Sequence, residues 1–326
     1  MPQAKILVIR GGAIGDFILT LPVLAALREQ FPAARLEVLG YPHIAQLALA
    51  GGQADEVRSI EAGALAGFFA RDGKLHDSLQ EYFAGFGLII SFLYDPDEIL
   101  QTNVARCSSA LFMAGPHRPE EAAGRHAAET FLKPLERLAI YEPDPVPQLK
   151  LPVLPQGVLH KPLTSRRVSG VKKLEASSRQ SIRRTLALHP GSGSERKNWP
   201  EARWASLLHE LNRMTSWSFL LVGGEAEGAK LDRLATAVPA TRLQLARSLP
   251  LAELAGNLSS CDAFVGHDSG ISHLAAALGM QTLVLWGDTV EAVWRPLGNH
   301  VTIVRAPGGL VALDMGTVLA QLIALV

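Results

Sequence analysis

The sequence predicts an α/β protein made of two doubly wound halves, each with a parallel sheet covered by helices. Three observations support this fold class. Short apolar runs alternate with helical patterns along the chain, the alternation stops once and restarts, and the interruption is rich in proline. Continuous apolar strands separated by helices are typical of parallel sheets that are buried on both faces.

The first half is expected within residues 1–160. Its predicted strands are KILVIR (5–10), RLEVLG (35–40), EVRSI (56–60), LIISFL (88–93) and SALFMAG (109–115). Six prolines lie between Pro143 and Pro162, and residues 161–184 hold eight basic residues against one acidic residue. We interpret this basic segment as a linker. Contact with anionic lipid or with a phosphorylated acceptor, and a solvated, partly disordered loop, are the alternatives for it.

The second half, residues 185–311, repeats the alternation. Its predicted strands are LALHP (186–190), SFLLVGG (218–224), RLQLA (242–246), AFVGHD (263–268), TLVLWG (282–287) and VTIVRA (301–306). A C-terminal helix over residues 312–326 is expected to cross back and brace the first half. Because open α/β sheets bind ligands outside the carboxyl ends of their strands, two such halves predict a cleft walled by strand-to-helix loops.

Composition excludes several classes of protein. The chain has 326 residues, 48% of them hydrophobic, so it can bury a sizeable core. Lys plus Arg and Asp plus Glu number 31 each, which argues against a general attraction to nucleic acid. Two cysteines can form neither a disulfide framework nor a four-cysteine zinc site, and with no signal-peptide pattern at the N-terminus we expect a cytoplasmic protein.

The loop after the first strand, in IRGGAIGDFILTLP (9–22), raises a question. A glycine-rich turn before a helix commonly holds a phosphate. Here the helix begins beside Asp16, which would repel an anion, and the glycines 11, 12 and 15 do not follow G-x-G-x-x-G. The loop is therefore predicted to serve another purpose, with a plain N-cap as the alternative for Asp16. Arg10 either guides a substrate anion or ends the strand in solvent.

A second loop, HPGSGSERKNWPEARW (189–204), places small residues next to a cation. Ser192, Ser194 and Lys197 are candidates for a phosphate grip, since the backbone can approach closely and the ammonium supplies charge. A solvated surface loop is the alternative. His189 and His267 have no partners at ligand spacing, so we predict no metal site.

The third loop, in FVGHDSGISHLAAALG (264–279), ends a strand and opens a helix. Asp268, Ser269 and Gly270 precede the helix, and His273 lies one turn into it. The free N–H groups and the serine hydroxyl suit a diphosphate. Simple helix capping by Asp268 and Ser269 is the alternative.

These three motifs together resemble glycosyltransferase family 9, the bacterial lipopolysaccharide heptosyltransferases, over roughly residues 4–290. The resemblance implies a GT-B fold, with two Rossmann-like domains around a cleft. It implies an inverting, metal-independent enzyme without cofactors, which moves a heptose from ADP-heptose to a hydroxyl of the lipopolysaccharide core. His267, before Asp268, departs from the small or apolar residue expected there.

The resemblance also implies roles for individual residues. Asp16 matches the proposed general base, with Arg10 and Gly15 on the acceptor side of the cleft. Lys197 contacts the donor phosphates, and Asp268, Ser269, Gly270 and His273 line the donor site. A cytoplasmic location is implied, with the cytoplasmic face of the inner membrane as a candidate peripheral contact. A nucleotide-sugar epimerase of the same architecture and a non-catalytic nucleotide-sugar-binding protein are the competing functions.

Overall fold

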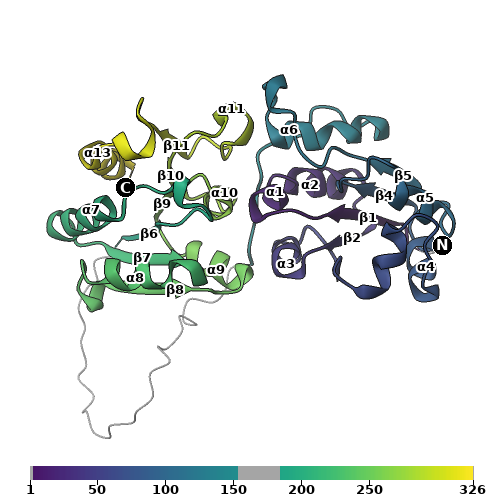
Figure 1. Cartoon of the computed structure of the whole chain (residues 1–326), viewed down its shortest axis with the longest axis horizontal. Helices are drawn as coiled ribbons and strands as arrows, with labels where there is room; N and C mark the ends of the chain where they lie inside the picture. Colours follow the sequence, from purple (N-terminus) through teal and green to yellow (C-terminus); the bar gives the residue numbers. More distant parts are fainter. Residues whose placement is uncertain (1–2, 153–183, 326) are drawn as a thin grey trace, which may run out of the picture.

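The computed structural model describes residues 3–152 and 184–325, which form two parallel sheets, each with helices on both faces (Figure 1). All the predicted strands are confirmed, with ends that differ from the predicted ones by no more than two residues. Burial explains this agreement: the central strands are apolar on both faces and almost wholly buried, as a covered parallel sheet requires.

The first half has the strand order β3-β2-β1-β4-β5. Its strands are β1 (Lys5–Arg10), β2 (Arg35–Gly40), β3 (Glu56–Ser59), β4 (Leu88–Ser91) and β5 (Leu111–Ala114). Its α-helices are α1 (Ile14–Ile18), α2 (Leu21–Gln30), α3 (Pro42–Ala50), α4 (Asp77–Ala84), α5 (Ile99–Ala105) and α6 (Ala127–Leu132).

The second half has the order β11-β10-β9-β6-β7-β8. Its strands are β6 (Thr185–His189), β7 (Ser218–Gly223), β8 (Leu243–Arg247), β9 (Ala263–His267), β10 (Gln281–Leu285) and β11 (Val301–Val304). Its α-helices are α7 (Glu201–Met214), α8 (Gly228–Ala235), α9 (Leu251–Leu258), α10 (Gly270–Ala277), α11 (Glu291–Trp294), α12 (Gly309–Ala312) and α13 (Met315–Leu325). In both halves the strand order reverses beside the first strand, which is where such sheets bind ligands.

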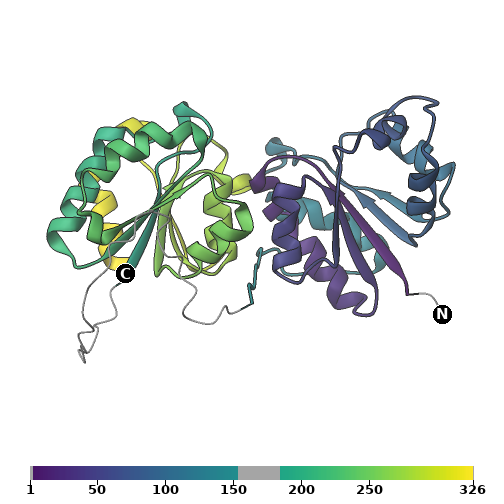
Figure 2. The same cartoon turned by 90° about the horizontal axis from the view of Figure 1, so that it is seen from below.

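The two halves meet through the first turns of α1 and α10, which face each other between the sheets (Figures 1 and 2). Glycine is required at this contact. A Cβ on Gly270 would lie 2.6 Å from the Cβ of Ile14 and 2.9 Å from the backbone nitrogen of Gly15. Farther along, the Leu149 N–H donates to the Ala277 carbonyl at 2.7 Å, and one hydrophobic cluster includes residues of both halves. The strand-end loops of the two sheets are therefore held against each other.

The prediction that the C-terminal helix crosses back to the first half is wrong. Helix α13 packs on α7 and β10 of its own half, and Figure 1 shows it beside α7. Val318 and Leu322 are fully buried in a cluster with Trp204 and Leu207. The apolar face of α13 thus completes the core of the second half. The basic segment 161–184 lies outside the described residues except for Arg184.

Candidate functional site

Two adjoining cavities, of about 740 and 750 Å³, lie between the halves. Both are lined by strand-end loops of the two sheets, and they share Gly15, Ser192, Ser269 and Gly270 in their walls. The first cavity also contains Asp16, Lys197, Asp268 and His273 in its wall. The structure therefore brings together side chains that the sequence placed in three separate motifs.

Asp16 both caps helix α1 and faces the first cavity. Its Oδ2 accepts a hydrogen bond from the Ala13 N–H at 2.9 Å, while its side chain remains 28% exposed. Gly12, with φ of 96°, makes room for this carboxylate, because a Cβ there would lie 2.8 Å from Oδ2. Asp16 therefore caps the helix, as the alternative hypothesis predicts, and its carboxylate still faces the cavity.

Arg10 lies behind Asp16 and its side chain is 2% exposed. Its Nη2 is 3.6 Å from Oδ1 of Asp16, and its Nη1 donates to the carbonyls of His117 at 3.0 Å and Phe92 at 3.3 Å. The guanidinium also lies over the Phe131 ring, 4.4 Å from its centroid. Burial lowers the pKa of Arg10 to about 10, and the nearby carboxylate opposes this shift, so the residue stays charged at neutral pH. The anion that Arg10 faces in the structure is Asp16; its role as a guide for substrate stays a prediction.

On the opposite wall, Lys197 and Asp268 form an ion pair. The Lys197 Nζ lies 2.8 Å from Oδ2 of Asp268, and the Thr289 hydroxyl donates to the same oxygen at 2.5 Å. Lys197 remains 40% exposed beside the cavity. The ammonium is thus held at the cavity wall by a carboxylate that an incoming anionic group can replace.

Ser269 caps helix α10 at the junction of the two cavities. Its side chain accepts from the Ser272 N–H, and its Oγ lies 3.4 Å from Nδ1 of His189. His273 follows one turn later and is 5% exposed, and its Nδ1 has no hydrogen-bond partner. Burial lowers the pKa of His273 to about 4, so its ring is neutral at pH 7.

His267 binds the loop that carries Lys197 through both of its ring nitrogens. Its Nε2 accepts from the Trp199 N–H at 2.7 Å, so its Nδ1 carries the proton and donates to the Gly191 carbonyl at 3.2 Å. Burial lowers the pKa of His267 to about 4, which keeps the ring neutral. The histidine that departs from the expected pattern therefore has a structural role. Ser192 from this loop reaches both cavities, whereas Ser194 lines neither of them.

Comparison with known proteins agrees with this arrangement. The family model described as glycosyltransferase family 9 (heptosyltransferase) matches residues 156–315. Lipopolysaccharide heptosyltransferase 1 of Pseudomonas aeruginosa is 40% identical over 97 residues, which are 28% of this chain and 26% of that protein. Lipopolysaccharide heptosyltransferase 3 of Escherichia coli is 22% identical over 304 residues, 88% of this chain and 84% of that protein. By these matches the chain is similar to glycosyltransferase family 9.

The fold agrees with solved structures as well. The E. coli ADP-heptose lipopolysaccharide heptosyltransferase II superposes with a TM-score of 0.72 at 18% identity, covering 98% of each chain. The two facing doubly wound halves are thus the GT-B fold that the resemblance implies, and the protein is a glycosyltransferase. The roles of its site residues stay predictions.

The second cavity of this glycosyltransferase includes residues that sequence reasoning missed. Part of its wall is formed by the ends of β7 and β8 and the start of α9, including Gly224, Ala246, Leu249 and Leu254. Apolar residues at a strand end look like ordinary core in a sequence. Thr289 was missed as well, because it belongs to none of the three motifs. A polar residue in the loop after β10, at the same edge as Asp268, was the available signal.

Within residues 3–152 and 184–325, no group of three or more His, Cys, Asp and Glu residues is placed to hold a metal ion. No helix in this part of the chain is long and apolar enough to cross a membrane. Trp286 is fully buried, and its Nε1 donates to the Thr289 carbonyl at 2.9 Å, so it stabilises the loop that carries Thr289.

Proposed function

We propose that this glycosyltransferase transfers a heptose from ADP-heptose to a hydroxyl of a lipopolysaccharide core sugar, in the cytoplasm, with inversion and without a metal. The observation that carries the proposal is the first cavity. A carboxylate of the first half, Asp16, and an anion grip of the second half, Lys197 with the start of α10, line the same space. An acceptor and a donor have room to meet between them.

Asp16 acts in this proposal as the general base. The Ala13 N–H and Arg10 fix the carboxylate, while its exposed edge faces the cavity. As the acceptor oxygen attacks the anomeric carbon, its proton passes to Asp16. Because the diphosphate leaves toward the opposite wall, the attack comes from the other side of the sugar, which inverts the anomeric centre.

The second half stabilises the leaving ADP. The free N–H groups at the start of α10 and the ammonium of Lys197 favour the negative charge that develops on the diphosphate. When the donor binds, the Lys197 ammonium leaves Asp268 and pairs with the phosphate, while Thr289 retains its hydrogen bond to Asp268. The nucleoside then extends into the second cavity, whose apolar wall suits a base.

Two similarities support the choice of substrates. The relatives are named as lipopolysaccharide heptosyltransferases, and the E. coli enzyme of similar fold is named for ADP-heptose. The predicted membrane contact through residues 161–184 falls outside the described residues and stays a prediction.

The test uses purified full-length protein, ADP-heptose and deacylated lipopolysaccharide core that lacks heptose. We expect mass spectrometry to show one added heptose, and NMR to show an inverted anomeric configuration. Activity should persist in EDTA. A donor-only reaction separates the competing functions, because an epimerase would convert the nucleotide sugar without acceptor. Absence of transfer to every core acceptor tested would contradict the proposal.

A further inference from the structure

An aromatic pair lines the first-half wall of the first cavity. Tyr94, in the loop after β4, and His117, in the loop after β5, have ring centroids 4.7 Å apart at an interplanar angle of 60°. Both residues line the cavity that contains Asp16. Tyr94 is nevertheless 70% exposed, so most of its ring surface is free to contact a ligand. None of the three sequence motifs includes either residue.

A single buried side chain, that of Arg10, fixes the positions of this pair and of Asp16 relative to one another. Nη1 of Arg10 binds the backbone carbonyl of His117 at 3.0 Å and that of Phe92 at 3.3 Å, two residues before Tyr94. Its Nη2 binds the Asp16 carbonyl at 3.3 Å and lies 3.6 Å from the Asp16 carboxylate. The three loops that carry Tyr94, His117 and Asp16 are thus fixed by one guanidinium, although they are far apart in the sequence.

The chemistry of such a pair favours a sugar ring. The C–H groups on one face of a pyranose carry partial positive charge, and the face of an aromatic ring carries partial negative charge. Sugar-binding cavities therefore gain from an exposed aromatic face next to groups that bind hydroxyls. Tyr94 and His117 belong to the first half, as Asp16 does, whereas the residues assigned to the donor belong to the second half, so the sugar that the pair meets is the acceptor.

We infer that Tyr94, backed by His117, forms the acceptor subsite, and that it stacks on one face of the core sugar whose hydroxyl approaches Asp16. This inference rests on the proposed function. It assigns Tyr94 to acceptor binding and leaves donor binding to the second half. Arg10 is a positioning residue in this arrangement, since its buried guanidinium holds the loops that carry Tyr94, His117 and Asp16.

The experiment compares Tyr94→Ala and Tyr94→Phe with the parent, using ADP-heptose and the deacylated heptose-deficient core as probes. Loss of the ring should raise the acceptor KM roughly tenfold, the upper range for one aromatic contact, with the donor KM unchanged. Tyr94→Phe retains the stacking face and should keep an acceptor KM within about twofold of the parent. His117→Ala should raise the acceptor KM by a smaller factor, because it removes only the support behind Tyr94.

Tyr141→Ala provides the matched control. Tyr141 is 68% exposed, close to the value of Tyr94, but lines neither of the two cavities between the halves. Its removal should leave both KM values unchanged. The acceptor-free hydrolysis of ADP-heptose and the thermal unfolding midpoint are measured for every variant, and all should match the parent.

Each outcome of these measurements supports or overturns the acceptor subsite. An acceptor KM for Tyr94→Ala within twofold of the parent, or an equal rise in the donor KM, overturns the acceptor subsite while the proposed function stands. If the acceptor KM of Tyr94→Phe rises as much as that of Tyr94→Ala, the phenol hydroxyl rather than the ring face binds the sugar, and the stacking inference is wrong. A parent that transfers no sugar to any core acceptor overturns the proposed function, and the inference with it.

Discussion

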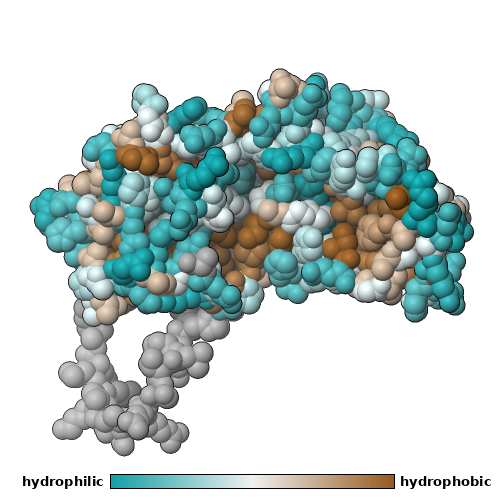
Figure 3. All heavy atoms as spheres, viewed as in Figure 1, coloured by the Kyte–Doolittle hydropathy of each residue, from teal (hydrophilic) through white to brown (hydrophobic). Residues whose placement is uncertain are grey.

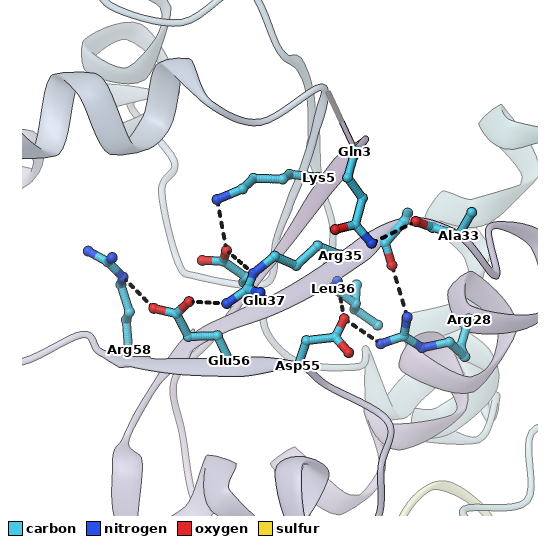
Figure 4. A network of polar contacts seen from close by, with 11 residues as sticks. Gln3, Lys5, Arg28, Ala33, Arg35, Leu36, Glu37, Asp55, Glu56 and Arg58 are labelled. Carbon is cyan, nitrogen blue, oxygen red and sulfur yellow. Dashed lines mark hydrogen bonds and ion pairs between the residues drawn. The ribbon is translucent and has the colours of Figure 1, made fainter. Parts of the chain in front are cut away.

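The two ends of the first sheet carry charged residues of very different kinds. At the starts of β1, β2 and β3, charged side chains pair with one another in a chain that runs from Lys5 through Glu37, Arg35 and Glu56 to Arg58 (Figure 4). At the ends of β1, β4 and β5, Arg10 is buried and binds protein groups through Nη1 and Nη2, while Asp16 keeps an exposed edge on a cavity. Both regions contain ion pairs, but only the second places an exposed carboxylate on a cavity between the halves.

The network at the strand starts is built around two carboxylates. Glu37 and Glu56 are paired in the register of β2 and β3, an arrangement of like charges that would destabilise the sheet without compensation. Arg35 bridges them at 3.1 and 2.6 Å, Lys5 adds a contact to Glu37 at 3.1 Å, and Arg58 adds one to Glu56 at 3.1 Å. Open α/β folds bind their ligands outside the carboxyl ends of the strands, so this network at the amino ends is expected to act on stability alone.

The difference shows that an ion pair does not by itself mark a functional site. What marks the site is a charged group with unused capacity at a cavity wall. Asp16 and Lys197 have this property, whereas Glu37 is buried between cations and faces no cavity among those found between the halves. Substitutions in the two regions should therefore separate activity from stability.

The largest effect is expected for Asp16→Asn. The asparagine side-chain oxygen can still accept from the Ala13 N–H, so the start of α1 is kept while the base is lost. Transfer should fall by about 10²–10⁴-fold, the usual contribution of one positioned base. ADP affinity by calorimetry and the unfolding midpoint should change little. A transfer rate equal to that of the parent would remove Asp16 from the mechanism.

Glu37→Gln should reduce stability and leave activity unchanged, which is the reverse of the result expected for Asp16→Asn. Its side chain is 1% exposed, and the substitution removes a charge that Lys5 and Arg35 both contact. Hydrogen bonds to charged groups contribute about 1.5–3 kcal/mol, so urea denaturation should report a loss in that range. The kcat of transfer should be unchanged. Lost activity in a folded variant would mean that the two ends of the sheet are coupled.

A pH series should separate the strand-start network from the loop of the second half that carries Lys197, without any ligand. Burial lowers the pKa of His267 from 6.5 to about 4, so between these values the unfolded chain binds a proton that the folded chain does not. Stability should therefore fall as the pH drops from 6.5 toward 4, by up to about 1.4 kcal/mol per pH unit for this histidine. Urea denaturation at several pH values measures the slope.

The carboxylate network should respond in a lower pH range. The hydrogen bond from Arg35 lowers the pKa of Glu56 below its ordinary 4.5, so its contribution is present above 4.5 and is lost as the pH falls through the lower folded value. Glu56→Gln should thus leave the slope between pH 6.5 and 5 unchanged, whereas His267→Asn should reduce it. Equal slopes in the parent and His267→Asn would show that His267 does not contribute.

Much of the fold and part of the site could be predicted from the sequence. The strands were predictable because apolar runs such as KILVIR have one stable environment, a covered parallel sheet. Asp16, Lys197 and Asp268 were predicted to meet because strand-end loops converge. The contacts that Thr289 and Tyr94 make were not predictable, since they depend on loop conformations that no local pattern encodes. The place of α13 was mispredicted, because an apolar helix face does not reveal which core it completes.

The smallest effect is expected for Arg58→Ala, at the exposed edge of the strand-start network. The Arg58 side chain is 47% exposed, and it contacts Glu56 and lies over the Tyr82 ring, 4.2 Å from its centroid. Exposed pairs of this kind contribute about 0.2–1 kcal/mol, because solvent screens the charges and ordering the side chains costs entropy. A double-mutant cycle with Glu56→Gln, followed by urea denaturation, isolates the pair. A coupling free energy well above this range would mean that the network acts as one cooperative unit. The strand starts would then differ from the strand ends in stability by more than the individual distances indicate.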